Sequence, residues 1–358
     1  MTGLTWLISP FTDLNHKRSS HGDTYYELDG LRGIAVFIVL LSHTASFGMF
    51  GQGSLGVLMF FFLSGFVLSL PYQENPKKIF KKKHIFRFFI NRTLRIIPAY
   101  YVAILIIFSI TTVKLDWVLW NASFIKGWNH FWSVAQEARF YLLFPFVIAF
   151  ISFFKSQAVR LLILISLIAF FYEYRTAHKI DMLDQRHVSF YFWIFLGGVL
   201  TCQLHQWDKL IHLFKKPYVK LFLLSLSFLT LFLLIFSSSH YMNTLWKPLF
   251  PFIPTGFQMN GWKLPILWFW LFLGLFLSAT IYKRSFLHTF LSNWFFRHIG
   301  LLSYSIYLYH MNIMFILIQK GYTHEKLFFL VLICSYVAAY ISYVLIEKPA
   351  LKLKHVFN

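Results

Sequence analysis

Arg32 and His43 are the two side chains best suited to take part in a reaction in the stretch ELDGLRGIAVFIVLLSH, residues 27–43. They are eleven residues apart, and a helix turns about 1100° over that distance, about 20° from three full turns. Both side chains therefore lie on one stripe, roughly 16 Å apart along the axis. Ionisable groups are costly in lipid, so such a stripe faces a cavity or another helix. Because burial favours a neutral imidazole, we predict that His43 is a general base.

The same stretch leaves other roles open. His43 could instead be a packed histidine that hydrogen-bonds to a neighbouring helix. Arg32 lies near the expected cytoplasmic boundary, where it could anchor a phosphate or carbonyl in a tunnel beneath His43, or simply extend to the interface. We expect Asp29 and Gly30 to form a turn before the helix, with Asp29 capping the helix or pairing with Arg32.

Glu137 is the carboxylate that could assist His43. It lies at the expected outer end of the fourth apolar stretch, at a depth similar to that of His43. Arg139 is two residues away and points to another helix face, so we expect the partner of Glu137 to lie on a different helix. A histidine oriented by a carboxylate is typical of an activated base. The alternative is an ion pair with a structural role only.

A basic cluster precedes the third apolar stretch, running from Lys77 to Arg95. Most of it is typical of a cytoplasmic stop signal or of contact with anionic lipids. Arg92 and Arg95 have i,i+3 spacing and share a helix face. Two adjacent guanidinium groups suit a phosphorylated molecule such as coenzyme A, so we predict a donor-binding site there.

Two further groups are predicted to support this chemistry. Ser303, Tyr307 and His310 follow i, i+4, i+7 and form a polar stripe on the ninth apolar stretch, although tyrosine hydroxyls there equally suit helix packing. Ser64 and Gly65 form a small-residue patch that would allow a neighbouring helix to approach closely.

The composition predicts a polytopic membrane protein. Of 358 residues, 58% are hydrophobic and only 13% are charged, far below the roughly 25% of soluble domains. The net charge of +20 would suggest nucleic acid in a soluble protein, but membrane proteins carry such charge in cytoplasmic loops, so we expect no nucleic-acid partner. Cys202 and Cys334 lie within apolar runs, and no metal-ligand spacing is present.

We predict an all-α fold of about ten transmembrane helices. The inner segments hold more than twice as many Lys and Arg as the outer ones if the N-terminus is cytoplasmic, which places both termini in the cytoplasm. The expected domains are a cytoplasmic segment over 1–27, a transmembrane domain over 28–351 and a short cytoplasmic tail over 352–358. The expected spans are about 30–50, 54–72, 96–113, 133–152, 160–173, 188–204, 220–237, 264–282, 300–319 and 327–346.

These residues together resemble the acyltransferase 3 family of integral membrane acyltransferases. The resemblance covers Tyr26 to Leu351, and its most specific part is ELDGLRGIA with the Arg32-x10-His43 spacing. Five further motifs match in family order: FFLSGF around Ser64, Arg92-x-x-Arg95, the Trp132-Ser133 to Tyr141 block around Glu137, Ser303-Tyr304 to His310, and Ile346-Glu347-Lys348-Pro349. The family usually has two adjacent acids in the Trp-Ser block, whereas the second position here is Ala138.

The resemblance implies a function as well as a fold. Members take an acyl group, commonly acetyl, from cytoplasmic acyl-CoA and pass it to an extracytoplasmic hydroxyl, usually of a glycan such as O-antigen, exopolysaccharide or peptidoglycan. It implies that His43, Glu137 and Arg32 are catalytic, that Arg92 and Arg95 bind acyl-CoA, and that supporting roles fall to Asp29, Ser64, Trp132, Ser303, Tyr304, Tyr307 and His310. We expect no metal and no permanently bound cofactor, with acyl-CoA, a glycan or lipid-linked glycan acceptor and membrane lipids as partners, in a bacterial inner membrane.

Two mechanisms and two rival functions remain open. His43 could deprotonate the acceptor hydroxyl, with Glu137 steadying the imidazolium, or it could take the acyl group itself as a nucleophile. A transporter would also place histidine and arginine in the membrane, although no inverted repeat is visible in the sequence. The second rival function is a lipid-binding scaffold.

Overall fold

The computed structural model describes residues 25–44, 53–125, 127, 129–177, 188–236 and 265–357. This part of the chain folds into helices and contains no strand. It divides into two compact units. Of the described residues, unit 1 contains those of Phe61–Asp208 and those from Tyr340 onward, and unit 2 contains those between 25 and 60 and those of Lys209–Ala339. Each unit is treated by itself.

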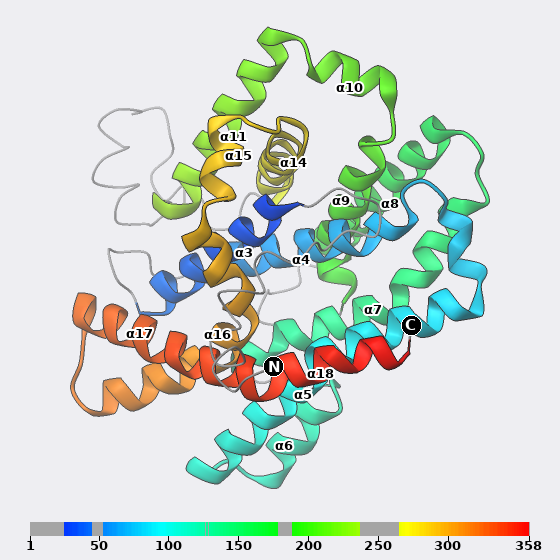
Figure 1. Cartoon of the computed structure of the whole chain (residues 1–358). Helices are drawn as coiled ribbons and strands as arrows, with labels where there is room; N and C mark the ends of the chain where they lie inside the picture. Colours follow the sequence, from blue (N-terminus) through cyan, green and yellow to red (C-terminus); the bar gives the residue numbers. More distant parts are fainter. Residues whose placement is uncertain are drawn as a thin grey trace. The chain divides into compact units, whose positions relative to one another are not determined.

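Unit 2 is organised around α3 and α16, which pack against each other (Figure 1). Both helices bury apolar side chains over most of their length, including Leu31, Ile38, Leu302 and Ile306. The unit contains α3 (Tyr26–His43), the first half of α4 (Gly53–Ser69), α10 (Asp208–Phe214), α11 (Pro217–Phe236), α14 (Pro265–Ile281), α15 (Phe286–Leu291), α16 (Trp294–Gln319) and most of α17 (His324–Ser342).

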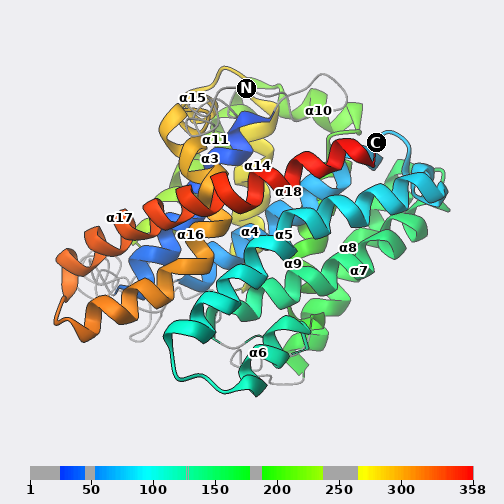
Figure 2. The same ribbon diagram turned by 60° about the horizontal axis from the view of Figure 1, so that its bottom comes forward.

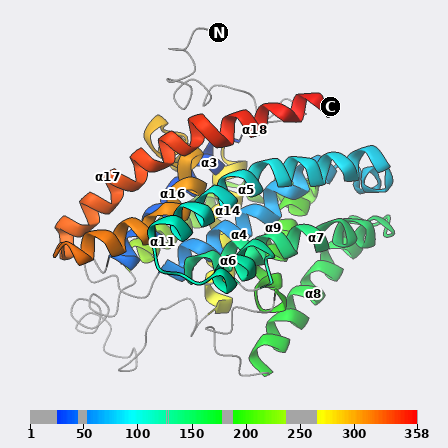
Figure 3. The same ribbon diagram turned by 90° about the horizontal axis from the view of Figure 1, so that it is seen from below.

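Unit 1 contains the remaining helices. Its C-terminal segment, η7 and α18, runs along α5 (Figure 3). The unit contains the second half of α4, then η3 (Leu70–Tyr72), η4 (Pro76–Phe80), α5 (Lys82–Ile110), α6 (Leu115–Ala122), η5 (Asn129–Phe131), α7 (Trp132–Ser152), α8 (Gln157–Ala177), α9 (Ser189–Leu204), the π-helical turn η7 (Tyr343–Glu347), α18 (Lys348–Lys352) and η8 (Leu353–Val356).

Each of the ten expected spans coincides with a helix in the described residues. Seven of the described helices are long and apolar enough to cross a membrane, and α9 and α14 are shorter apolar helices. The prediction of an all-helical membrane protein is therefore confirmed for this part of the chain. The count of ten spans and the sides of the two termini stay predictions.

The start of α3 differs from the predicted turn. The helix begins at Tyr26, so Asp29 and Gly30 lie inside its first two turns rather than before it. A Cβ on Gly30 would lie 1.8 Å from the carbonyl oxygen of Leu291, so glycine here lets α15 pack directly on the α3 backbone. The helix also ends earlier than expected, at His43 rather than near residue 50. Residues 45–52 lie outside the described part.

The helix α5 is longer than predicted. It begins at Lys82, which places Arg92 and Arg95 in its third and fourth turns rather than in a segment ahead of it. The segment expected as an outer loop at 114–132 contains α6, which packs against α5 (Figure 2). The hydroxyls of Tyr100 and Tyr101 on α5 donate to the carbonyls of Asn121 and Ala122, at 3.1 and 3.0 Å.

The small-residue patch on α4 is confirmed as a close helix contact. A Cβ on Gly65 would lie 2.0 Å from the carbonyl oxygen of Phe195 on α9. A Cβ on Gly198 of α9 would lie at the same distance from the carbonyl oxygen of Phe62. Glycine on both helices therefore lets the backbones touch, which fixes the α4 residue Ser64 in position.

Candidate active site

The histidine predicted as the base forms its hydrogen bond within unit 2. His43 is the last residue of α3, and its Nδ1 lies 2.9 Å from Nε2 of His310 on α16. The two rings stack with their centroids 5.0 Å apart. His310 is fully buried, whereas His43 is partly exposed. The structure therefore brings together two of the predicted site residues that are far apart in the sequence.

The hydrogen bonds of His310 fix where the protons lie on both rings. Nδ1 of His310 is 2.7 Å from the backbone carbonyl oxygen of Tyr307. A carbonyl can only accept, so Nδ1 of His310 carries a proton and the neutral ring accepts at Nε2. Nδ1 of His43 must then be the donor between the rings, which leaves the lone pair of the neutral His43 ring on Nε2.

The start of α4 lies next to this lone pair. A Cβ on Gly53 would lie 3.5 Å from Nε2 of His43, and the backbone N–H of Gly53 donates to the hydroxyl of Ser42 at 2.6 Å. The hydroxyl of Ser54 is buried and has no hydrogen-bond partner among the described residues. A helix start attracts negative charge, so the hydroxyl of Ser54 suits a developing oxyanion, whereas the N–H of Gly53 is already bonded to Ser42. No sequence motif marks this region, so it was not among the predicted site residues.

The other predicted residues of unit 2 occupy the same two helices. A guanidinium nitrogen of Arg32 lies 3.1 Å from the carboxylate of Asp29, so the pairing predicted as one option for Asp29 is confirmed. On α16, the hydroxyl of Ser303 donates to the carbonyl of Gly300 at 2.8 Å. Tyr304 is partly exposed on the same helix.

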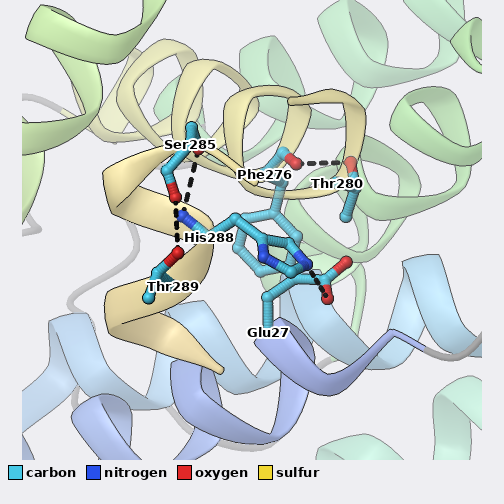
Figure 4. Close-up of polar contacts among 6 residues, drawn as sticks. All are labelled: Glu27, Phe276, Thr280, Ser285, His288 and Thr289. Atoms are coloured by element: carbon cyan, nitrogen blue, oxygen red, sulfur yellow. Dashed lines mark hydrogen bonds and ion pairs between the residues drawn. The ribbon is translucent and has the colours of Figure 1, made fainter. Parts of the chain in front are cut away.

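The start of α3 also makes a polar contact with α15 that sequence reasoning missed (Figure 4). Nε2 of His288 on α15 lies 3.5 Å from a carboxylate oxygen of Glu27, whose side chain is only 1% exposed. The hydroxyl of Ser285 accepts the backbone N–H of His288 at 3.1 Å and so caps α15 (Figure 4). A carboxylate in the first turn is favoured by the helix dipole, and this pair fixes the helix that carries Arg32 and His43.

The predicted carboxylate has its partners within unit 1. One oxygen of Glu137 accepts hydrogen bonds from the hydroxyls of Ser64 on α4 and Tyr141 on α7, both at 2.5 Å. Tyr141 follows Glu137 by four residues, so their common helix face was readable in the sequence. His43 belongs to the other unit, and its predicted pairing with Glu137 stays a prediction.

The two arginines of α5 have different surroundings. The guanidinium carbon of Arg92 lies 5.8 Å from the ring centroid of Tyr141, and its charge interacts with Glu137 and Arg95. Arg139 turns away, as the sequence predicts: it donates to the carbonyl of Phe124 at 3.0 Å and to Gln136 at 3.3 Å. Trp132, the first residue of α7, packs against the rings of Phe61 and Tyr191. Its role is packing in this structure.

The described residues contain no group of three or more His, Cys, Asp or Glu side chains that could hold a metal ion. In unit 2 the available group is a base with a defined lone pair, and in unit 1 it is a carboxylate held by two hydroxyls next to a cation.

Comparison with known proteins identifies the family. A family described as an acyltransferase domain, the acyltransferase 3 family, matches residues 25–347. The O-acetyltransferase OatA of Staphylococcus aureus is 31% identical over 171 residues, which cover 40% of this chain and 28% of the relative. The peptidoglycan O-acetyltransferase OatA of Listeria monocytogenes is 30% identical over 172 residues, which cover 39% of this chain and 27% of the relative.

The match to these relatives spans less than a third of their own length. No solved structure matches the chain significantly. The match to an acyltransferase family over most of the chain favours the predicted enzyme class over the transporter and scaffold alternatives.

Proposed function

Because the chain belongs to the acyltransferase 3 family, we propose that this membrane O-acetyltransferase moves acetyl from cytoplasmic acyl-CoA to a hydroxyl of an extracytoplasmic glycan. The observation that carries this proposal is the hydrogen-bonded series from the Tyr307 carbonyl through His310 to His43. It presents one basic nitrogen with a defined lone pair, which is what deprotonation of a sugar hydroxyl requires.

Both chemical routes begin at Nε2 of His43. In the direct route, Nε2 removes the hydroxyl proton while the hydroxyl oxygen attacks the thioester carbonyl carbon. The carbon–sulfur bond then breaks, and the thiolate takes up the proton from the imidazolium. In the other route, Nε2 attacks the thioester carbonyl carbon and the carbon–sulfur bond breaks, which releases the CoA thiolate and leaves acetyl on the ring. The hydroxyl oxygen then attacks this acetyl carbon, the bond from that carbon to Nε2 breaks, and the hydroxyl proton passes to the thiolate. The start of α4, with the unpartnered hydroxyl of Ser54, is suited to stabilise the negative charge on the carbonyl oxygen in either route.

Glu137 is proposed to stabilise the positive charge that His43 acquires. The hydroxyls of Ser64 and Tyr141 hold its carboxylate in one position without neutralising it. A carboxylate fixed in this way needs no reorganisation when the imidazolium forms, which is the source of most electrostatic catalysis.

Arg92 and Arg95 are proposed to bind the phosphates of acyl-CoA. They are the two arginines nearest the middle of α5, and the basic cluster from Lys77 continues into this helix from its N-terminal side. Two guanidinium groups of one helix face offer several donors to phosphate oxygens. Their position supports a donor site on the cytoplasmic side, given the orientation that the loop charges predict.

Peptidoglycan is the acceptor that we propose first. The relative from Listeria monocytogenes carries that substrate in its name, and the staphylococcal relative is also an O-acetyltransferase. The protein would then be a multi-pass protein of a bacterial plasma membrane. If peptidoglycan is not the acceptor, we propose another envelope glycan, since such glycans also present sugar hydroxyls.

Membranes that carry the protein, radiolabelled acetyl-CoA and purified peptidoglycan test this proposal. We expect label to enter the glycan with the wild type and not with His43→Ala at matched expression. Equal labelling by both proteins would refute the role of His43. If neither protein labels any envelope glycan while acetyl-CoA still binds, the proposed acceptor class is wrong. If acetyl-CoA binding is unchanged in an Arg92→Gln, Arg95→Gln double variant, the proposed donor site is wrong.

A further inference from the structure

A cavity of about 480 Å³ lies within unit 1, between α5, the turn that follows α6, and α7. Its volume falls in the range of small-molecule sites, about 300–1,000 Å³. The walls are mainly apolar and include Ile97, Phe124 and Leu142. Arg92 is part of the lining, whereas Arg95 is not. The structure therefore separates two arginines that the sequence treats as a pair.

One wall of the cavity is irregular backbone, which a membrane protein tolerates only where it is buried or lines a cavity. This wall is the turn after α6, where Phe124 has a positive φ of 57°. A guanidinium nitrogen of Arg139 donates to the carbonyls of Phe124 and Ile125, at 3.0 and 2.5 Å. The polar backbone of this turn is thereby satisfied, and Arg139 is engaged in holding it.

Arg92 supplies positive charge to the cavity. Its Nε–H is buried and has no hydrogen-bond partner among the described residues. No carboxylate is among the described residues that line the cavity. Ala138 lines it at the position where the family usually has a second acid. With alanine there, the lining combines two arginines, Arg92 and Arg139, with apolar walls, which suits an anion that carries an alkyl chain. Glu137 lies outside the lining and interacts with the charge of Arg92.

The mouth of the cavity opens at a lipid-facing surface. Two of its lining residues, Leu142 and Ile125, are 61% and 60% exposed. Phe146, one turn further along α7, is 73% exposed, as expected for a side chain in contact with lipid. Arg92 lies about 7 Å closer than Ile97 to the basic N-terminal end of α5. Arg92 thus lies toward the basic end of the helix, whereas Arg139 is bonded to the carbonyls of Phe124 and Ile125 at the turn after α6.

We propose that this cavity binds a lipid phosphate, with the phosphate at Arg92 and one alkyl or prenyl chain against Ile97, Phe124 and Leu142. Ala138 is then a residue that determines specificity, because a carboxylate in its place would repel the phosphate. The lipid is either a phospholipid of the bilayer or the carrier of a lipid-linked glycan. The proposal shares Arg92 with the proposed donor site: a lipid phosphate at Arg92 leaves Arg95, which lies outside the lining, for the phosphates of acyl-CoA. Lipid binding itself needs no transfer chemistry, so it is tested separately from acetyl transfer.

Photo-crosslinking of the purified full-length protein tests the proposal. The probes are phosphatidylglycerol and a prenyl phosphate, each with a diazirine in the chain, and the uncharged diacylglycerol with the same diazirine chain. We expect the phosphate lipids to label the α5 and α7 peptides about fivefold more than diacylglycerol, since one surface arginine contributes roughly that factor. The stronger of the two phosphate probes identifies the source of the lipid. Equal labelling by diacylglycerol would overturn the proposal.

Two matched pairs of variants test the cavity itself. Ala138→Glu and Ala138→Gln add side chains of the same size, so a further loss of about fivefold in Ala138→Glu reports the charge alone. Leu142→Trp narrows the mouth and should lower labelling, whereas Phe146→Trp, on the same exposed face but outside the cavity, should not. Because Leu142 is exposed, its variant tests the site even if the Ala138 variants do not fold. Labelling that neither pair changes would refute the site.

Discussion

The histidine pair of unit 2 and the carboxylate cluster of unit 1 are held by different kinds of partner. His43 is held by another histidine, and that ring is in turn fixed by a backbone carbonyl. Glu137 is held by two neutral hydroxyls, from Ser64 and Tyr141. The first arrangement determines where a proton lies, and the second determines where a negative charge lies. A base and the group that stabilises its cation need these two kinds of control.

The sharpest test of this comparison is whether the two groups work as one. We expect His43→Ala to lower the transfer rate by about 10³-fold, within the range for loss of a general base. Residues that act as a unit are strongly non-additive, so His43→Ala combined with Glu137→Gln should be no slower than His43→Ala alone. Initial rates with labelled acetyl-CoA at equal protein amounts measure this. A double variant that loses the product of both effects would show that the groups act independently.

Glu137→Gln alone separates the effect of the Glu137 charge from the effect of the hydrogen-bond geometry around it. The amide oxygen can still accept from Ser64 and Tyr141, so the cluster keeps its shape while the negative charge is lost. We expect a fall in kcat of about 10²-fold, similar to loss of one group that stabilises a transition-state charge. A thermal unfolding midpoint equal to that of the wild type is the control. A change in rate of less than about twofold would rule out an electrostatic role.

Variants of His310 test whether its hydrogen bond positions the ring of His43. His310→Leu removes the acceptor for Nδ1–H of His43 and frees the ring to turn. We expect kcat to fall by about 10²-fold with little change in KM, because small misplacement of a reacting group has effects of that size. His310→Gln offers a carbonyl oxygen as a replacement acceptor and should recover part of the rate. If both variants lose the same activity, His310 has a packing role only.

Local sequence pattern predicted the long helices well but misjudged the start of α3 and missed the short helix α6. Each apolar stretch of about twenty residues coincides with a helix, because membrane helices satisfy their own backbone. The polar start of α3 reads as a turn, yet it is helical because α15 packs on Gly30 and His288 pairs with Glu27. The eight-residue helix α6 was read as a loop, because it is stabilised by contacts with Tyr100 and Tyr101 that no local pattern contains.

The sequence was a better guide to the identity of the site residues than to their partners. Tyr141 is four residues from Glu137, so that contact follows from helix geometry. His43 and His310 are 267 residues apart, and Ser64 and Glu137 are 73 apart. Only tertiary packing decides which polar groups of distant helices meet. A base and an acid expected at similar depth therefore suggested a pair. That pairing stays a prediction, and the structure shows a further partner for each within its own unit.

The smallest expected effects come from the two hydroxyls that hold Glu137. Tyr141→Phe and Ser64→Ala each remove one donor to a charged acceptor, and Tyr141→Phe keeps the ring beside Arg92. Hydrogen bonds to charged groups contribute about 1.5–3 kcal/mol, so we expect each variant to lose about tenfold in kcat. In each single variant the remaining hydroxyl still holds the carboxylate, so the double variant should lose more than the product of the two. Rates of all four proteins complete this double-mutant cycle. A double variant no slower than either single one would mean that the two hydroxyls act through a shared packing contact, and that Glu137 is positioned by something other than these bonds.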